Sequence, residues 1–324
     1  MTTAARNVVQ AGPDLETFAR EVMRGLASSP RTLPCKYLYD ARGSEIFEEI
    51  CGLEEYYPTR TELEIFERDL PEIAAAIGPG ALVIEYGCGA SVKTHKLMAA
   101  LEDPAGIVAV DISEPALRDS AERLRGAFPG LFVSAVVADF TDPEGVPLPA
   151  CDPRKRVVFF PGSTIGNFTR SEARAFLARQ ADLVGTGGGL LVGVDLKKDP
   201  RVLEAAYDDA RGVTAAFNLN VLAHINRELG ADFDLDAFEH CALYRDPPGR
   251  IEMWLVANRD QRVRLRDKVF TIAKGEGICT EHSAKYSVTE FRGMAWSAGF
   301  SLDRVWTDSR GWFSVHYGEV RGRR

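Results

Sequence analysis

The middle of the chain consists of short apolar blocks, each followed by a longer amphipathic stretch. Ala81 to Ile84 are apolar in succession, which is typical of a strand buried on both faces of a parallel sheet. Similar blocks lie at residues 106–113, 131–140, 156–168 and 187–199. Regular alternation of such strands with helices predicts an α/β protein with an open, Rossmann-like parallel sheet.

This alternation stops near residue 200 and resumes near residue 286. Between these points we predict a helix containing Tyr207, a mixed segment around Asn218 and Asn220, and then two strands, IEMWLVA and RVRL. The remainder of the chain predicts a helix followed by two strands, SLDRVWTD and WFSVHYGEV, which form a closing antiparallel hairpin.

The interruption predicts two lobes. We expect a sheet domain from residues 61–196 and 286–324, and a second, α+β, substrate-binding lobe from residues 1–60 and 197–285. Within the first 60 residues, 14–29 and 44–53 read as amphipathic helices, the second of them capped by Ser44. Tyr57 precedes a proline and is therefore expected to be extended.

The carboxyl end of the first block turns tightly. Gly87 and Gly89 follow Glu85, and a turn without side chains lets a ligand approach the backbone before the next helix begins near Ser91. The third glycine of a dinucleotide fingerprint is absent, because Ser91 and Val92 stand there instead. This absence argues against a dinucleotide pyrophosphate.

Polar residues stand at the carboxyl ends of four predicted strands. Glu85, Asp111, Asp139 and Asn167 occupy these ends. Ligands of open α/β sheets bind along this edge, and Asp111 lies 24 residues after Gly87, where a ribose-binding carboxylate is expected. The coincidence of the four positions predicts a nucleotide-type site at that edge.

Overall charge and cysteine spacing narrow the class of protein further. A net charge of −8 and a pI near 5.3 argue against a general binder of nucleic acid or of anionic membranes. No apolar run approaches the roughly 20 residues of a membrane span, and the first residues carry no export signal. The six cysteines contain no C-x-x-C pair, so we expect no metal site. Without an export signal, we expect a cytoplasmic protein with reduced thiols. We also expect it to be a monomer.

Three longer sequence strings point to a particular protein family: YDARGSEIFEEICGLEEYYPTRTE, GSTIGNF and CTEHSAKYS. Together with the strand-end acids, Asp139-Phe140 and the final hairpin, they resemble the histidine-specific Nα-methyltransferases of ergothioneine biosynthesis. The resemblance runs from about residue 30 to about residue 317. It implies a class I methyltransferase that uses S-adenosylmethionine to convert L-histidine to hercynine, with S-adenosylhomocysteine as the second product.

The resemblance also implies roles for individual residues. The cofactor contacts would be Gly87, Lys93, Asp111, Asp139 and Phe140. Asp111 would accept both ribose hydroxyls, Asp139 would accept from the adenine amino group beside Phe140, and Lys93 would neutralise the methionine carboxylate.

For the substrate, the resemblance implies that one set of residues holds the amino-acid backbone and another the ring. Tyr56, Asn167 and Tyr207 would hold the backbone, Tyr39 would lie near the reacting amine, Glu281 and Ser283 would bind the imidazole, Met253 would line the side-chain pocket, and His282 would touch the substrate through its backbone only. The amine must lose its proton before it reacts, and Tyr39 or a water held by Asn167 are the candidate acceptors.

The residues themselves leave two interpretations open, both for the segment around Glu281 and for the tyrosines at 39 and 56. Glu281 and Ser283 would point to the same side of an extended segment, but on a helix Glu281 would pair with Lys285 instead. The tyrosines at 39 and 56 would bind a ligand or would stack to seal a seam between the lobes.

Three other functions compete with histidine methylation. A methyltransferase of the same build would act on tryptophan or arginine, although Met253 and Glu281 favour histidine. A nicotinamide-dependent oxidoreductase is disfavoured by the missing glycine and by the hairpin. A non-catalytic S-adenosylmethionine sensor is disfavoured by the presence of Tyr56, Asn167 and Glu281.

Overall fold

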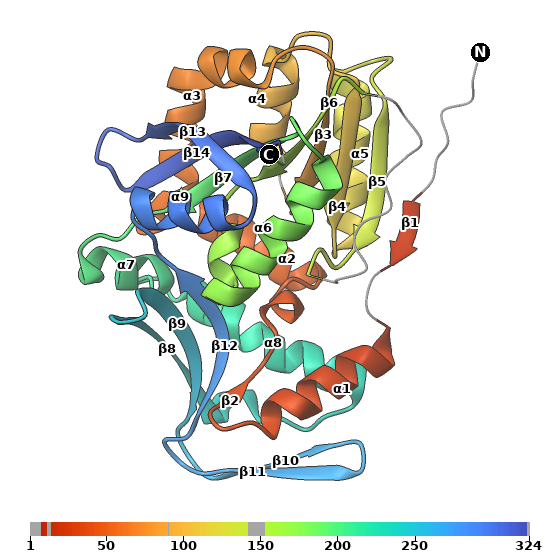
Figure 1. Cartoon of the computed structure of the whole chain (residues 1–324). Coiled ribbons are helices and arrows are strands. Elements are labelled where there is room, and N and C mark those ends of the chain that lie inside the picture. Colours follow the sequence, from red (N-terminus) through yellow and green to blue (C-terminus); the bar gives the residue numbers. More distant parts are fainter. Residues whose placement is uncertain (1–7, 12–13, 90, 142–152, 323–324) are drawn as a thin grey trace. The chain divides into compact units, whose positions relative to one another are not determined.

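The computed structural model describes residues 8–11, 14–89, 91–141 and 153–322 (Figure 1). Contacts between residues divide the chain into two compact units. The first, here called the sheet unit, comprises residues 1–12, 58–197 and 285–324. The other, here called the insert unit, comprises residues 13–57 and 198–284.

The sheet unit alternates strands and helices along the chain. Its strands are β1 (Val8–Ala11), β3 (Ala81–Tyr86), β4 (Gly106–Asp111), β5 (Val133–Ala138), β6 (Lys155–Phe160), β7 (Gly189–Asp195), β13 (Phe300–Thr307) and β14 (Phe313–Val320). Its helices are α3 (Tyr57–Ile77), α4 (Val92–Ala100), α5 (Glu114–Ala127), the short η2 (Thr164–Asn167), α6 (Arg170–Val184) and α9 (Val288–Ser297).

The eight strands form one sheet in the order β1-β5-β4-β3-β6-β7-β14-β13. Strands β1 to β7 in this sheet pair in parallel, whereas β14 runs antiparallel to β7 and β13 antiparallel to β14. The reversal of strand order between β4, β3 and β6 creates a switch point at the carboxyl end of β3, where ligands of such sheets bind. The predicted parallel sheet with a closing antiparallel hairpin is therefore confirmed.

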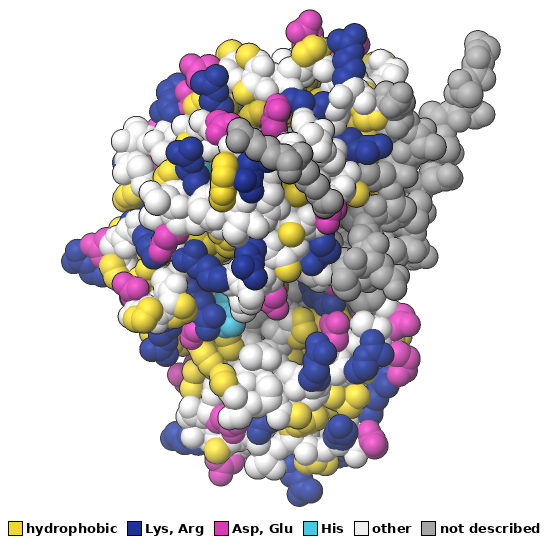
Figure 2. All heavy atoms as spheres, in the orientation of Figure 1, with side chains coloured by type: hydrophobic (Ala, Val, Ile, Leu, Met, Phe, Trp, Pro, Cys, Tyr) yellow, Lys and Arg dark blue, Asp and Glu magenta, His cyan; other side chains and the backbone are white. Residues whose placement is uncertain are grey.

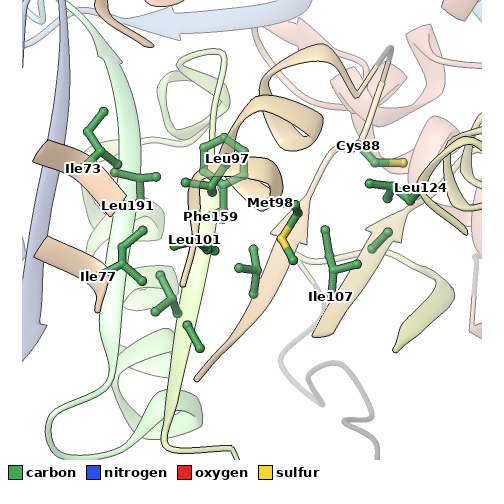
Figure 3. Packing of buried hydrophobic residues seen from close by; sticks show 14 of the residues in the cluster. Ile73, Ile77, Cys88, Leu97, Met98, Leu101, Ile107, Leu124, Phe159 and Leu191 are labelled. Atoms are coloured by element: carbon green, nitrogen blue, oxygen red, sulfur yellow. The ribbon is translucent and has the colours of Figure 1, made fainter. Parts of the chain in front are cut away.

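Burial on both faces explains why the central strands are continuously apolar. All six residues of β3 are buried. On one face the side chains pack against α3, α4 and α5, and Figure 3 shows Ile73, Leu97, Met98 and Leu124 in the same cluster of buried residues as Phe159. On the other face, side chains of β3 and β6 contact α6 through aromatic rings.

Two details of the sheet unit differ from expectation. Strand β1 pairs with β5, so residues 8–11 belong to the sheet unit and not to the lobe that was expected to begin at residue 1. Tyr57 is the first residue of α3 and is not extended, because Pro58 then occupies the first helical turn, where its missing N–H costs no hydrogen bond.

The insert unit combines a small sheet with helices. Its helices are α1 (Leu15–Leu26), η1 (Cys35–Leu38), α2 (Ala41–Cys51), α7 (Pro200–Tyr207), α8 (Val213–Leu229) and η3 (Leu235–Ala237). Its strands β2 (Arg31–Thr32), β12 (Gly277–Ala284), β9 (Arg250–Ala257) and β8 (Phe238–Arg245) pair in that order, and β10 (Gln261–Leu265) pairs with β11 (Lys268–Ile272).

Two predictions for the insert unit were wrong. Helix α8 spans the segment around Asn218 and Asn220 that was expected to be mixed, because both side chains find polar partners inside the unit. Helix α2 begins at Ala41, and its cap is Asp40 rather than Ser44: the Asp40 carboxylate accepts a hydrogen bond from the Gly43 N–H at 2.7 Å.

The surface matches the mixed charge composition. On the face drawn in Figure 2, basic and acidic side chains are interspersed, and hydrophobic side chains lie singly or in small groups. Within the described residues, no helix combines the length and the apolar character that a membrane span requires.

Candidate active site

The turn after β3 is open on its outer side. Gly87 and Gly89 have positive φ angles of 77° and 37°, and the Gly87 N–H donates to the carbonyl of Val110 on the neighbouring strand at 2.9 Å. A Cβ atom added at either glycine would meet no atom within 4 Å outside its chain neighbours. The backbone of this turn is therefore accessible to a ligand, and helix α4 begins directly behind it at Val92.

Asp111 closes β4 beside this turn. Its carboxylate accepts hydrogen bonds from the N–H of Cys88 at 3.1 Å and from the N–H of Ser113 at 2.9 Å. Burial raises the pKa of Asp111, although these backbone donors act in the opposite direction. The two N–H groups fix the orientation of the carboxylate, and a carboxylate has further lone pairs with which to accept from a diol.

Glu85 is a buried acid directly before the turn. It is 1% exposed, and one carboxylate oxygen, Oε1, accepts from the hydroxyl of Thr94 on α4. The other oxygen, Oε2, is buried without a hydrogen-bond partner among the described residues. Burial raises the pKa of Glu85 to about 8, so the side chain is largely protonated at neutral pH.

Glu85→Gln is expected to stabilise the protein most at alkaline pH. Native Glu85 keeps its proton up to a pKa of about 8, whereas in the unfolded chain the carboxyl loses it near 4.5. The unfolded state binds fewer protons in this window, so the wild-type free energy of unfolding falls as pH rises through it. Glutamine removes this loss, and urea denaturation at both ends of the window measures the difference.

Glu67→Gln, on the exposed surface of α3, is the control for this comparison. It should show no comparable growth of its effect with pH. A stability gain for Glu85→Gln that is the same at acid and alkaline pH would contradict the raised pKa of Glu85.

Lys93 on α4 is held by a carboxylate that the sequence did not indicate. Its ammonium pairs with the carboxylate of Glu62 on α3, and the Glu62 side chain is fully buried. The same carboxylate accepts from the N–H of Gly162, at 2.9 Å for the nearer oxygen. Strand β7 makes room at Gly193, where an added Cβ would lie 2.1 Å from Glu62 Oε1. Glu62 thus fixes both Lys93 and the loop after β6.

Asp139 and Phe140 follow β5, at the same edge of the sheet. The Asp139 carboxylate accepts from the N–H of Thr141 at 2.8 Å. The Phe140 ring belongs to an aromatic group, with ring centroids 5.7 Å from Tyr86 and 6.2 Å from Phe168. Asn167, which ends η2, immediately precedes Phe168 and is half-buried.

These features fit an adenosyl cofactor in three respects. The turn at Gly87 and Gly89 leaves open space, Asp111 is oriented by backbone donors, and Phe140 offers an apolar ring. Glu85 Oε2, which has no hydrogen-bond partner among the described residues, could in addition take a polar group of the ligand, since an unsatisfied buried oxygen is costly. All residues expected to contact the cofactor lie in the sheet unit.

Three of the substrate candidates, Glu281, Ser283 and Met253, lie on one face of the insert-unit sheet. Glu281 and Ser283 are two apart in β12 and therefore share a face. Glu281 stands directly opposite Met253 of β9, and cross-strand partners also share a face. The helical alternative, in which Glu281 pairs with Lys285, is wrong, because residues 277–284 form a strand and Lys285 pairs with Asp195.

Tyr207 joins this group from the end of α7. Its hydroxyl lies 2.8 Å from the Ser283 hydroxyl, and its ring centroid lies 6.0 Å from that of Tyr56. Tyr39 follows η1 and contacts Phe217 of α8, with centroids 5.3 Å apart. Burial raises the pKa of Tyr39 and of Tyr56 well above the usual range, and the nearby Glu281 adds to the shift for Tyr39 and the nearby Tyr207 to the shift for Tyr56.

His282 lies between the two ring-binding candidates but on the other face of β12. It stands opposite Glu252, whereas Glu281 stands opposite Met253. The imidazole of His282 thus points away from the face that carries Glu281 and Ser283. On the face that carries Glu281 and Ser283, His282 therefore contributes only its backbone.

Comparisons with known proteins identify the family to which the chain belongs. Residues 18–320 match the family model described as "Histidine-specific methyltransferase, SAM-dependent". The chain is 42% identical over 320 residues to the histidine N-alpha-methyltransferase of Mycolicibacterium smegmatis, covering 97% of this chain and 98% of the relative. It is 41% identical to that of Mycobacterium tuberculosis, covering 91% and 92%. It is also 31% identical to ergothioneine biosynthesis protein 1 of Neurospora crassa, covering 86% of this chain and 32% of that longer protein.

Proposed function

Because the chain belongs to the family of histidine-specific, S-adenosylmethionine-dependent methyltransferases, we propose that it transfers three methyl groups in succession to the α-amino nitrogen of L-histidine. The products are hercynine and S-adenosylhomocysteine. Hercynine would be the first intermediate of ergothioneine biosynthesis, in line with the name of the Neurospora relative. The observation that carries this proposal is that Glu281, Ser283 and Met253 lie on one face of the small sheet. The Tyr207 hydroxyl is hydrogen-bonded to the Ser283 hydroxyl on that face.

The sheet unit would hold the cofactor, which supplies an electrophilic methyl group when bound. Asp111, which two backbone N–H groups orient, would accept from the ribose hydroxyls, and Asp139 would accept from the adenine amino group beside Phe140. The Lys93 ammonium, which pairs with Glu62, would also neutralise the methionine carboxylate.

The insert unit would select the substrate by its ring. A neutral imidazole has one N–H donor and one acceptor nitrogen. The Glu281 carboxylate would accept from the N–H, and the Ser283 hydroxyl would donate to the other nitrogen while it accepts from the Tyr207 hydroxyl, which lies 2.8 Å away. A ring without these groups would leave buried polar atoms unpaired, and such sites discriminate strongly.

The raised pKa of Tyr39 favours a water held by Asn167 over Tyr39 itself as the acceptor of the amine proton. Because burial and Glu281 disfavour the phenolate, Tyr39 is a neutral phenol and a very weak base. Tyr39 therefore orients the amine by a hydrogen bond, and a water held by Asn167 takes the proton. The rings of Tyr39 and Tyr56 also stabilise the cationic, increasingly methylated nitrogen.

Transfer in line from sulfur to nitrogen moves a positive charge without creating one, so positioning is the main contribution of the protein. Alignment of the reacting atoms contributes about 7–11 kcal/mol in favourable cases.

Mass spectrometry of amino acids incubated with the enzyme and S-adenosylmethionine tests the proposal. We expect L-histidine to acquire one, two and then three methyl groups, all on the α-nitrogen, and tryptophan and arginine to remain unmodified. Methylation of a ring nitrogen, or preference for another amino acid, would contradict the proposed substrate. A product that stops at one methyl group would contradict the proposed multiplicity.

A further inference from the structure

Strand β12 contains a bulge immediately before Glu281. Cys279 pairs with Trp254 and Glu281 pairs with Met253, so Thr280 is an extra residue with none opposite it. In a regular ladder without the bulge, Thr280 would stand opposite Met253 and Glu281 opposite Glu252, so the Glu281 side chain would point to the other face of the sheet. The bulge thus decides on which face Glu281 and Ser283 lie.

Asn218 of α8 satisfies the polar groups at this bulge. Its side-chain carbonyl accepts from the Thr280 hydroxyl at 2.6 Å, and its amide nitrogen donates to the Trp254 carbonyl at 3.2 Å. The Thr280 hydroxyl also lies 3.2 Å from the Met253 carbonyl. Trp254 and Met253 are the residues on the partner strand at the bulge, so Asn218 replaces part of the interrupted ladder.

His240 of β8 connects the bulge to the end of α7. The Asn218 amide nitrogen lies 2.9 Å from His240 Nδ1, and the Trp254 carbonyl, which can only accept, fixes that atom of Asn218 as the nitrogen. Nδ1 therefore accepts, and Nε2 carries the proton and donates to the Tyr207 carbonyl at 2.8 Å. Burial lowers the pKa of His240 and thereby favours this neutral form.

The three linking side chains are almost inaccessible to solvent. Asn218 is 0% exposed, Thr280 is 1% exposed, and the His240 side chain is 2% exposed. A buried polar group that loses its partner is destabilising, so the network has one favoured arrangement. That arrangement fixes the backbone of Tyr207 at one end and the register of Glu281 at the other.

We propose that Thr280, Asn218 and His240 are positioning residues for ring recognition: they hold Glu281, Ser283 and Tyr207 in the arrangement that binds the substrate imidazole. This inference rests on the proposed function. The three residues act through the groups they hold and need not touch the substrate. The bulge and its network would therefore contribute to specificity for histidine.

A pair of substitutions at Thr280 tests the proposal in the full-length enzyme. Thr280→Val keeps the branched shape but removes the hydroxyl, whereas Thr280→Ser keeps the hydroxyl. We expect Thr280→Val to lower kcat/KM for histidine about tenfold, mainly through KM, and Thr280→Ser to stay within about threefold of wild type. The dissociation constant of S-adenosylhomocysteine should stay within about twofold in both variants.

A double-mutant cycle separates positioning from general destabilisation. In a Glu281→Ala background the added Thr280→Val change should cost less activity than it does in the wild type, because one of the groups that Thr280 helps to position is already gone. Fully additive losses, or an equal loss of cofactor affinity, would overturn the proposal. A wild-type enzyme that methylates another amino acid but not histidine would instead contradict the proposed function, and the role in ring recognition with it.

Nitrogen NMR of His240 provides a measurement that does not depend on activity. The network requires a neutral imidazole protonated at Nε2, and Thr280→Ser should keep this signature. Protonation at Nδ1 in the wild type, or a mixture of the two tautomers, would overturn the hydrogen-bond chain on which the proposal stands.

Discussion

Lys285→Met is expected to lower the free energy of unfolding of the sheet unit by about 3–5 kcal/mol. Lys285 Nζ lies 2.7 Å from Asp195 Oδ2, and both side chains are 0% exposed. Methionine would fill a similar volume but would leave the Asp195 carboxylate buried without its counter-charge. The cost therefore arises from the remaining charge more than from the lost attraction.

Two further variants make this prediction specific. Lys197→Met removes a lysine that pairs with Glu290 at 2.6 Å, but these side chains are 36% and 41% exposed, so we expect a loss below about 1 kcal/mol. Adding Asp195→Asn to Lys285→Met should recover part of the stability, because it removes the uncompensated charge.

Urea denaturation followed by tryptophan fluorescence measures all three variants. Three of the four tryptophans, Trp296, Trp306 and Trp312, lie in the sheet unit, so the signal reports mainly on that unit. Similar losses for the buried and the exposed lysine would contradict the assigned cost of the buried charge.

The sheet could be predicted from the sequence because its signals are local. Four apolar residues from Ala81 and the polar residue that ends each block reflect burial on both faces and a shared carboxyl edge. The final hairpin was likewise visible as two strands around Gly311, which has a φ of 67°. Such patterns depend on neighbours in the sequence, and tertiary contacts did not override them.

Helix α8 was missed because its polar residues have tertiary partners. Asparagine is unfavourable inside a helix, since its side chain competes for backbone hydrogen bonds. In this helix, Asn218 bonds to His240 and Thr280, and Asn220 donates to Asp40 at 2.7 Å. None of these partners adjoins α8 in the sequence, so the local sequence pattern could not predict that the two asparagines would be satisfied inside a helix.

The candidate site likewise has features that follow from the local sequence and features that depend on tertiary contacts. The alternation that places Glu281 and Ser283 on one face of an extended segment is local, but the sequence left open whether the segment is extended or helical, and the structure shows a strand. The bulge at Thr280 depends on register against β9, and Glu62 lies 31 residues before Lys93 on another helix. Register and helix packing are set by the whole fold, so neither feature could be seen in the sequence.

Glu281→Ala is expected to raise KM for histidine by about 10- to 100-fold while the affinity for S-adenosylmethionine changes by less than about twofold. The loss corresponds to a hydrogen bond between a charged acceptor and the ring N–H. Glu239→Ala, which truncates an exposed glutamate of β8 in the same sheet, is the matched control and should leave both constants near wild type.

Asp111→Ala should produce the reverse pattern, with a cofactor dissociation constant raised about tenfold or more and histidine recognition nearly intact once cofactor is saturating. Asp111 belongs to the sheet unit and Glu281 to the insert unit, so each truncation removes a group from only one of the two candidate binding sets. Calorimetry with each ligand and steady-state kinetics measure the two patterns. If both variants weakened both ligands equally, the division of recognition between Asp111 and Glu281 would be wrong, even if histidine remained the substrate.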